Sequence, residues 1–262
     1  MNQWLSLTKK EIRLGLPAFL IPVIVFIIVT SIAYYIGYRN GVGIISIIGV
    51  SSIALMAQVF YLPYFMFYSL ATERKTLHLW LHNPLSGAAL LTAKMVAGLL
   101  SMIPTLLIIG ATALIALSLK SDLIADIGIT LPNMFKPLVF GGVHLILISI
   151  SLSIGFIFFW MIFLMFTRFI GTFVSFVATF GLVIVTGSLY GWLSNTKLYE
   201  IITKWGEFKL VGLLKGFEFL IDESVPDVSD VSLYVGSYVF EVLLALILFY
   251  AACWILNRKV EV

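Results

Sequence analysis

Long runs of apolar residues follow one another along the chain, separated by short polar segments. Runs of about 20 apolar residues are long enough to cross the hydrocarbon core of a bilayer as helices. The pattern predicts six spans, at roughly 16–36, 44–69, 96–119, 138–166, 169–193 and 237–255. The ten-residue alternating strands typical of an outer-membrane barrel are missing from the pattern. We therefore expect an all-α integral membrane protein with a single transmembrane domain over residues 1–262.

Composition supports this prediction. Hydrophobic residues make up 61% of the chain and charged residues 11%, and the mean hydropathy is +1.10. Soluble domains average about 45–50% apolar and about 25% charged residues. The single cysteine, Cys253, lies in the sixth run, which rules out a disulfide within the chain and a thiolate cluster. Polar residues precede the first run and no small-residue cleavage site follows it, so we expect a retained helix and not a signal peptide.

The basic residues predict the orientation, because short cytoplasmic segments of membrane proteins are enriched in Lys and Arg. With the N-terminus inside, the inner segments hold most of the basic residues: Lys9, Lys10, Arg13, Arg74, Lys75, Lys94, Arg168, Arg258 and Lys259. The two short outer loops hold only Arg39, Lys120 and Lys136. We therefore expect both termini in the cytoplasm, a cytoplasmic loop at 70–94 and an extracellular insert at 194–236.

The cytoplasmic loop contains the pattern of a short amphipathic helix. Leu77, Trp80 and Leu81 recur at i, i+3 and i+4 and form one apolar stripe. Pro84 disfavours helical geometry at the residue before it, so this helix should end there. Ser86 is a suitable N-cap for a second helix that continues into the third span. Such a loop helix either rests on lipid headgroups or fits a groove on a soluble partner, and the pattern alone leaves both open.

The same loop resembles a known family. The run Glu73-Arg74-Lys75-Thr76-Leu77-x-Leu79-x-Leu81-x-Asn83-Pro84-Leu85-Ser86, followed by Lys94, is similar to the first intracellular loop of ABC-2-type exporter permeases, which have the type V ABC fold. In that family the loop forms a coupling helix that docks into the ATP-binding subunit. The segment Leu5-x-x-Thr8-Lys9-Lys10-Glu11-Ile12-Arg13 likewise resembles the amphipathic elbow helix of the family, which we expect over 1–15. Lys75 stands where the family often has a glycine before the threonine.

The resemblance implies a permease subunit whose loop docks the ATPase. The docking residues that it implies are Glu73, Arg74, Lys75, Leu77, Trp80, Leu81, Pro84 and Leu85. It also implies a working unit of two permeases, either two copies of this chain or this chain and a homologue, with two ATPases. No Gly-rich loop ending in Gly-Lys-Ser/Thr occurs in the sequence, so nothing in the chain is expected to cradle nucleotide phosphates. ATP and Mg²⁺ are expected to bind to the partner subunit. The chain itself is not expected to be an enzyme or to hold a cofactor.

Hydroxyl and amide side chains inside two spans are candidates for a translocation path. They fall on one helical face in each span: Ser51 and Gln58 in the second, and Thr172, Ser175, Thr179 and Thr186 in the fifth. In the resembled family these spans tend to line the path at the dimer interface. Such stripes also serve close helix packing in membranes, so packing stays an alternative.

Ionisable residues well inside the spans are His144 and Glu241. Intramembrane charges are functional candidates by default, but Glu241 lies near a span end and can snorkel to water. A structural or lining role near the outer side is favoured over a proton relay. In the cytoplasmic loop His78 and His82 share a helix face, but Leu79 stands in place of the glutamate of a His-Glu-x-x-His site and no third ligand is evident. We therefore expect no metal site.

The insert between the fifth and sixth spans carries two apolar stripes at helical spacing. The first comprises Leu198, Ile201, Ile202, Trp205 and Phe208, and the second comprises Leu210, Leu213, Leu214, Phe217 and Leu220. An acidic stretch at 222–230 predicts a loop after them. The stripes predict external helices at the outer membrane surface, and a hairpin with no transport role is the alternative.

These patterns favour an exporter permease in a bacterial plasma membrane, with lipids and an ATP-binding cassette subunit as partners and no nucleic acid. Apolar spans with few charged residues favour an amphipathic or lipophilic cargo, such as a membrane-active peptide, a lipid-like molecule or a drug. The alternative is a membrane anchor or sensor that recruits a partner without ATPase activity through the same loop. An intramembrane enzyme would need polar catalytic groups clustered at one depth, and the sequence does not show them.

Overall fold

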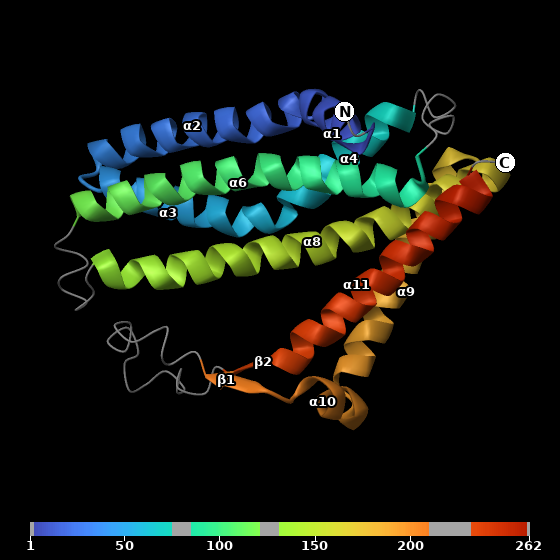
Figure 1. The fold of residues 1–262 in the computed structure, drawn as a ribbon. Helices are drawn as coiled ribbons and strands as arrows, with labels where there is room; N and C mark the ends of the chain where they lie inside the picture. The colour runs from blue at the N-terminus through green and yellow to red at the C-terminus, as the bar shows by residue number, and fades with distance from the viewer. Residues whose placement is uncertain (1–2, 75–84, 121–130, 210–231, 261–262) are drawn as a thin grey trace. The chain divides into compact units, whose positions relative to one another are not determined.

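The computed structural model describes residues 3–74, 85–120, 131–209 and 232–260 (Figure 1). The elements in chain order are α1 (Gln3–Leu14), α2 (Leu16–Arg39), α3 (Gly43–Ala57), the 3₁₀ turn η1 (Gln58–Phe60), α4 (Tyr61–Arg74), α6 (Gly87–Leu119), α8 (Leu131–Ile170), α9 (Thr172–Ser194), α10 (Lys197–Thr203), β1 (Glu207–Lys209), β2 (Ser232–Tyr234), α11 (Val235–Ile255) and the π turn η5 (Leu256–Val260).

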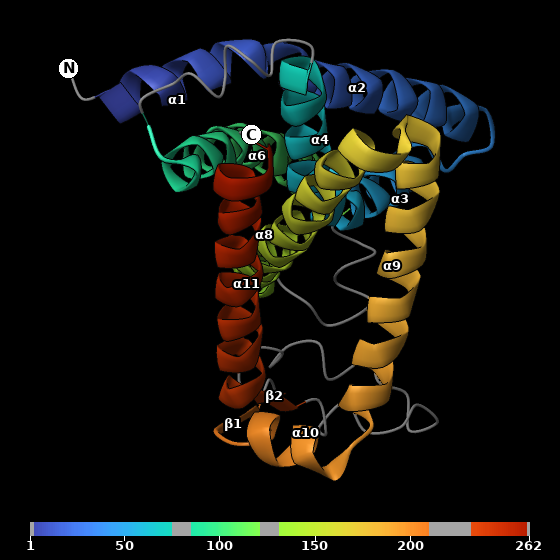
Figure 2. The same cartoon turned by 90° about the vertical axis from the view of Figure 1, so that its right-hand side faces the viewer.

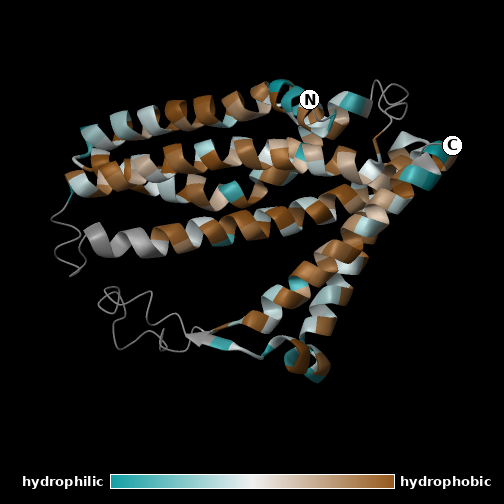
Figure 3. Cartoon of the chain, in the orientation of Figure 1, coloured by the Kyte–Doolittle hydropathy of each residue, from teal (hydrophilic) through white to brown (hydrophobic). Residues whose placement is uncertain are grey.

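Six helical stretches in the described part are long and apolar enough to cross a membrane. They are Gln3–Arg39, Gly43–Glu73, Gly87–Leu119, Leu138–Ile170, Thr172–Ser194 and Val235–Arg258. Figure 3 shows these stretches as mostly hydrophobic, with hydrophilic residues gathered in α1 and at the ends of α4 and α11. The prediction of an all-α multi-pass membrane protein with six spans is therefore confirmed.

The chain divides into two compact units, and α6 and α8 contribute residues to both. One unit comprises Met1–Lys75, Ala93–Ile150 and Leu210–Val231, and the other comprises Thr76–Thr92, Ser151–Lys209 and Ser232–Val262. The single transmembrane domain expected from the sequence stays a prediction.

The first unit is built on the helices at the start of the chain. Its core contains Ala18, Tyr61, Leu62, Phe65, Ala97 and Met102, from α2, α4 and α6. Two glycines let these helices approach closely: a Cβ on Gly15 would overlap the ring of Phe65, and a Cβ on Gly98 would lie 2.5 Å from Leu62 Cδ1. Small residues at such contacts are the usual means of tight helix packing in membranes.

The second span is broken at its middle, where α3 gives way to η1 and α4. Pro63 has no N–H to donate to the carbonyl four residues before it, and its ring crowds that carbonyl, which weakens the helical ladder at 58–63. The N–H of Tyr61 donates to the carbonyl of Gln58, which tightens the turn. The N–H of Leu62 donates instead to Ser149 Oγ on α8, at 3.3 Å. The predicted span 44–69 is therefore present, but as two helices joined by a tight turn.

The second unit contains α9 and α11, with α10 and a two-stranded hairpin at one end of both helices (Figure 2). The strands β1 and β2 are antiparallel, with Phe208 opposite Leu233. Here the predicted helical stripe from Leu198 to Phe208 is wrong in part, because the helix ends at Thr203 and Phe208 lies in a strand. Gly206 has φ +68°, a left-handed conformation that favours glycine and ends the helical path. The second predicted stripe, over 210–220, lies outside the described residues.

Candidate functional site

A cluster of charged side chains is buried where α1, α4 and α6 meet in the first unit. Lys94 of α6 lies at its centre, with Nζ 2.8 Å from Glu11 Oε2 of α1 and 2.6 Å from Glu73 Oε2 of α4. The same ammonium group donates to Ser69 Oγ at 2.8 Å, and Ser69 donates to Glu11 Oε2 at 3.1 Å. Lys94 is 0%, Glu11 1% and Glu73 6% exposed. We call Glu11, Ser69, Glu73 and Lys94 the charge cluster.

Helical periodicity explains how these side chains converge. On α1 the buried residues are Leu7, Thr8 and Glu11, while Lys9, Lys10 and Arg13 are exposed, so Glu11 lies on the face that packs inward. Ser69 and Glu73 are four residues apart on α4 and therefore share one face. Lys94 lies about two turns into α6, among apolar residues, and is fully buried. Three separate chain segments thus place four side chains at the same point: one from α1, two from α4 and one from α6.

The charge cluster contains two carboxylates and one ammonium group, so its charges balance only when a second cation, Lys10, is included. Lys94 faces two carboxylates, and Lys10 Nζ approaches Glu73 Oε1 at 3.5 Å from a more exposed position. Removing one partner of a buried ion pair typically destabilises a protein by about 3–5 kcal/mol, because the remaining charge is left without compensation. The cluster therefore fixes the end of α4 and the start of α6 to each other and to α1.

These two helix ends are the ones that flank residues 75–84 in the sequence. As predicted, Ser86 caps α6: its Oγ accepts from the N–H of Ala89 at 3.3 Å. Leu85 is half-buried just before α6. The other predicted docking residues, Lys75, Leu77, Trp80, Leu81 and Pro84, lie outside the described residues, as does the side chain of Arg74. The coupling helix therefore stays a prediction.

Glu73 differs from the expectation drawn from the sequence. The resemblance implies that Glu73 is one of the residues that dock the ATPase, but the structure buries its carboxylate against Lys94. The physical reason is helical spacing, since the residue follows Ser69 by four positions on the inward face of α4. Glu73 therefore belongs to the support of the loop and not to its exposed surface.

The candidate path residues divide between the two units. In the first, Ser51 and Gln58 are buried, and Gln58 Oε1 accepts from Thr105 Oγ1 at 3.4 Å. In the second, Ser175 and Thr179 are the buried residues of α9, whereas Thr172 is exposed. Ser175 Oγ donates to the carbonyl of Gly171 at 2.6 Å, and Thr186 Oγ1 donates to that of Leu182 at 2.8 Å. A path lined by both sets stays a prediction.

The two ionisable residues that the sequence analysis placed well inside the spans, His144 and Glu241, have different surroundings. His144 on α8 is half-buried, with its ring parallel to that of Phe140 and 6.4 Å between centroids. Glu241 on α11 is exposed. In the described part of the chain, no group of three or more His, Cys, Asp or Glu residues is arranged to hold a metal ion.

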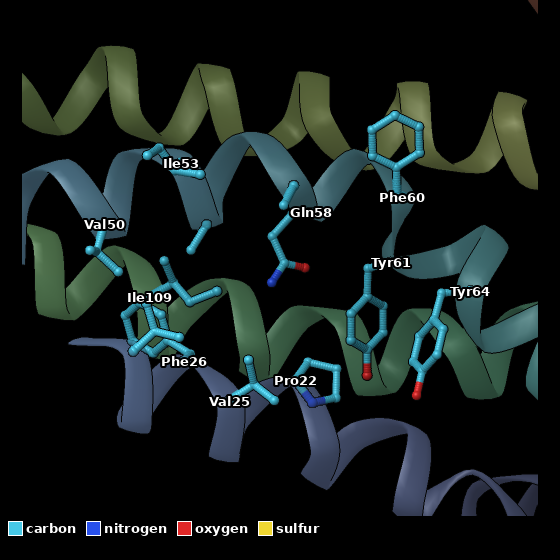
Figure 4. A pocket seen from close by; sticks show the side chains of 13 residues that line it. Pro22, Val25, Phe26, Val50, Ile53, Gln58, Phe60, Tyr61, Tyr64 and Ile109 are labelled. Atoms are coloured by element: carbon cyan, nitrogen blue, oxygen red, sulfur yellow. The ribbon is translucent and has the colours of Figure 1, made fainter. Parts of the chain in front are cut away.

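The first unit also contains a groove of about 400 Å³ beside the break in the second span (Figure 4). Its walls come from α2, α3, η1, α4 and one residue of α6, and its buried residues with polar groups include Gln58 and Tyr61. The sequence pattern identified Gln58 but not the groove, because the groove depends on the break at η1.

Sequence reasoning also missed the roles of Glu11, Ser69 and Lys94. A signal was present, since Glu11 follows Leu7 by four residues on the apolar face of an amphipathic helix, and Lys94 lies inside an otherwise apolar run. Comparison of the chain with models of protein families, with characterised proteins and with solved structures finds no match.

Proposed function

We propose that the chain is the permease subunit of an ATP-driven exporter and that its loop at 73–86 docks a separate ATP-binding subunit. The observation that supports this most directly is the charge cluster, together with the resemblance of the loop to ABC-2-type permeases. A docked loop does mechanical work on the spans only if the helices at its two ends move as one body. The ion pairs from Lys94 to Glu11 and Glu73 hold those helices together.

Magnitudes favour this interpretation. Moving a two-state permease from about 1:99 to 99:1 takes roughly 5.5 kcal/mol of differential interaction. If the loop joined two helices that moved independently, the free energy of docking would move these helices relative to each other and would not shift the permease between its two states. Two buried ion pairs on one lysine, whose separation would leave charges uncompensated at about 3–5 kcal/mol, resist that motion on the same scale.

The proposal includes the remaining parts of the assembly. ATP and Mg²⁺ bind to the partner subunit, and a second permease, identical or homologous, completes the membrane part. Both termini and the loop face the cytoplasm of a bacterial cell, where Lys9, Lys10 and Arg13 of α1 meet anionic headgroups at the inner surface of the plasma membrane. The cargo is amphipathic or lipophilic.

The alternative is a membrane anchor or sensor that recruits a partner without ATPase activity through the same loop. The charge cluster would then only stabilise the fold. The nature of the partner separates the two functions, since a subunit that hydrolyses ATP in dependence on this chain is expected only for the exporter.

The docking role is tested by the substitution Trp80→Ala in the full chain. Truncating a tryptophan at the centre of an interface typically costs 2 kcal/mol or more, which is roughly a thirtyfold loss of affinity. We expect membrane insertion to stay intact and recovery of the co-purified ATPase to fall by that factor. Arg74→Ala, a charge at the rim, should mainly change the salt dependence of assembly.

Trp192→Ala is the matched control, because Trp192 is an exposed tryptophan on α9 and not in the loop. It should leave ATPase recovery unchanged. Unchanged recovery and unchanged ATP-dependent transport for Trp80→Ala would remove the docking role and favour a loop helix that rests on lipid.

A further inference from the structure

The groove beside η1 is open along one side and apolar along most of its wall. It is lined by Pro22, Val25, Phe26 and Val29 of α2, Val50, Ile53, Ala54 and Ala57 of α3, Gln58 and Phe60 of η1, Tyr61 and Tyr64 of α4, and Ile109 of α6. Ile53 and Phe60 at its margin are 70% and 64% exposed, so the groove opens on the outside of the unit. A volume of about 400 Å³ lies within the range of about 300–1,000 Å³ that holds small molecules in other proteins.

Two buried residues of the groove carry polar groups, Gln58 with its amide and Tyr61 with its hydroxyl, and the amide points into the groove. Gln58 is 4% exposed, and Figure 4 shows its amide directed into the space that the labelled side chains surround. Within the described part of the chain, its side chain makes one hydrogen bond, with Thr105 Oγ1 at 3.4 Å. One half of the amide therefore faces the groove without a protein partner, whichever way the amide group is turned.

The depth of Gln58 decides which molecules can satisfy it. Gln58 lies at the centre of the stretch Gly43–Glu73, which crosses the membrane, and so near the middle of the hydrocarbon core. At that depth a phospholipid offers only methylene groups, which accept no hydrogen bond. Among the described residues that line the groove, none is charged, so a charged group would not be compensated there.

We propose that the groove binds an uncharged amphiphile: a hydrocarbon chain that carries an amide or ester group along its length, with that group hydrogen-bonded to the Gln58 amide. The molecule enters laterally from the lipid through the side bordered by Ile53 and Phe60. The aromatic rings of Phe26, Tyr61 and Tyr64 form the wall against which its hydrocarbon packs (Figure 4). Only the further claim that this molecule is the exported cargo rests on the proposed function.

The binding test uses the full chain, purified in lipid nanodiscs without ATP or a partner. The probe is an N-alkyl fatty amide that carries a diazirine, and bound probe is cross-linked by light and located by mass spectrometry. Cross-links are expected on residues of α2, α3 and α4 that line the groove. A non-reactive copy of the amide should compete about ten times better than an alkane of equal length, the difference that one buried hydrogen bond makes.

Two variants and a control test separately the hydrogen bond to Gln58 and the binding of hydrocarbon in the groove. Gln58→Leu keeps the volume and removes the polar group, so it should abolish the tenfold preference for the amide over the alkane. Ala57→Phe fills the groove, keeps Gln58 and should reduce labelling by the diazirine amide. Ser52→Ala is the control, because Ser52 is exposed on α3, bonds to the carbonyl of Ile48 at 2.9 Å and does not line the groove. It should bind as the wild type does.

Three results would overturn the proposal. Equal competition by amide and alkane in the wild type would mean that the groove holds the hydrocarbon of bulk lipid only. Cross-links between two copies at Ile53 or Phe60, with no labelling by the probe, would mean that a second copy fills it. An unchanged preference in Gln58→Leu would show that another group reads the amide. None of these results bears on ATPase docking, so the two proposals fail separately.

Discussion

The charge cluster and the groove of the first unit differ in whether the chain supplies hydrogen-bond partners for their buried polar groups. In the charge cluster, Lys94 contacts Glu11, Ser69 and Glu73, so the chain supplies partners for its buried charges. In the groove, Gln58 has a single weak contact, to Thr105, and one half of its amide faces open space. Polar groups that the chain pairs by itself hold segments together, whereas a buried group that the chain leaves unpaired needs a partner from outside. The predictions below test that distinction.

The largest effect is expected for Lys94→Met. This substitution removes the central cation and leaves two buried carboxylates close to each other, so we expect a loss of about 3–5 kcal/mol in the free energy of unfolding. The measurement is thermal unfolding in detergent together with the yield of folded protein.

Lys204→Met is the matched control, because Lys204 forms an ion pair with Glu200 at 2.7 Å in which both side chains are exposed. The hydrogen bond and charge of Glu200 raise the pKa of Lys204, so Lys204 keeps its charge at neutral pH. Its loss should not change the melting temperature measurably, since solvent screens exposed pairs. Equal melting temperatures for the two variants would contradict the structural role of the cluster.

Removing the three charges of Glu11, Glu73 and Lys94 together should cost less stability than removing that of Lys94 alone. Replacing a buried ion cluster with apolar residues of similar volume is often neutral or stabilising, whereas breaking it at one member is not. We therefore expect the triple variant Glu11→Leu, Glu73→Met, Lys94→Met to unfold at a clearly higher temperature than Lys94→Met alone. A triple variant no more stable than the single one would show that the lysine acts through packing and not through its charge.

A smaller effect is expected at the break in the second span. Ser149→Ala removes the acceptor of the Leu62 N–H, which the 3₁₀ turn has released from the helical ladder. An unpaired buried N–H costs about 1–3 kcal/mol, and unfolding in denaturant measures that loss. Ser118→Ala, at an exposed serine that bonds to the carbonyl of Ile115, should be near neutral. A neutral Ser149→Ala would mean that the Leu62 N–H finds another acceptor.

The smallest effect on stability is expected for Gln58→Leu. Its amide contributes one long hydrogen bond, and leucine fills a similar volume next to apolar neighbours, so we expect a change within about 1 kcal/mol of the wild type. Thermal unfolding in the absence of added amphiphile checks it. A loss as large as that of Lys94→Met would place Gln58 among the residues that hold the fold and would remove the contrast with the charge cluster.

The sequence predicted those parts of the structure that depend on neighbouring residues. The six spans follow from the length of each apolar run, and the cap at Ser86 follows from the residues beside it. A helix, α1, forms over Gln3–Leu14 with Leu7 and Glu11 buried, and its role as an elbow helix stays a prediction.

The parts that the sequence did not predict depend on residues far apart in the chain. Lys94 and Glu11 are separated by 83 positions, and no periodicity in either segment names the other as its partner. The apolar stripe at 198–208 favoured a helix through Phe208. Phe208 lies in a strand instead, because it pairs with Leu233, a residue on the other side of the insert. The groove requires the break before Pro63 as well as the packing of α2 beside α3. In each case the outcome is decided by tertiary contacts, which override the local pattern.

We propose that this chain couples ATP hydrolysis on another subunit to its own spans. The most direct test is ATP hydrolysis by material purified from native membranes through a tag on this chain, with equal amounts of wild type and Trp80→Ala. The account predicts hydrolysis in the wild-type preparation and a fall in the variant that matches the loss of the co-purified subunit. A wild-type preparation whose bound partner hydrolyses no ATP would contradict the account and favour a membrane anchor.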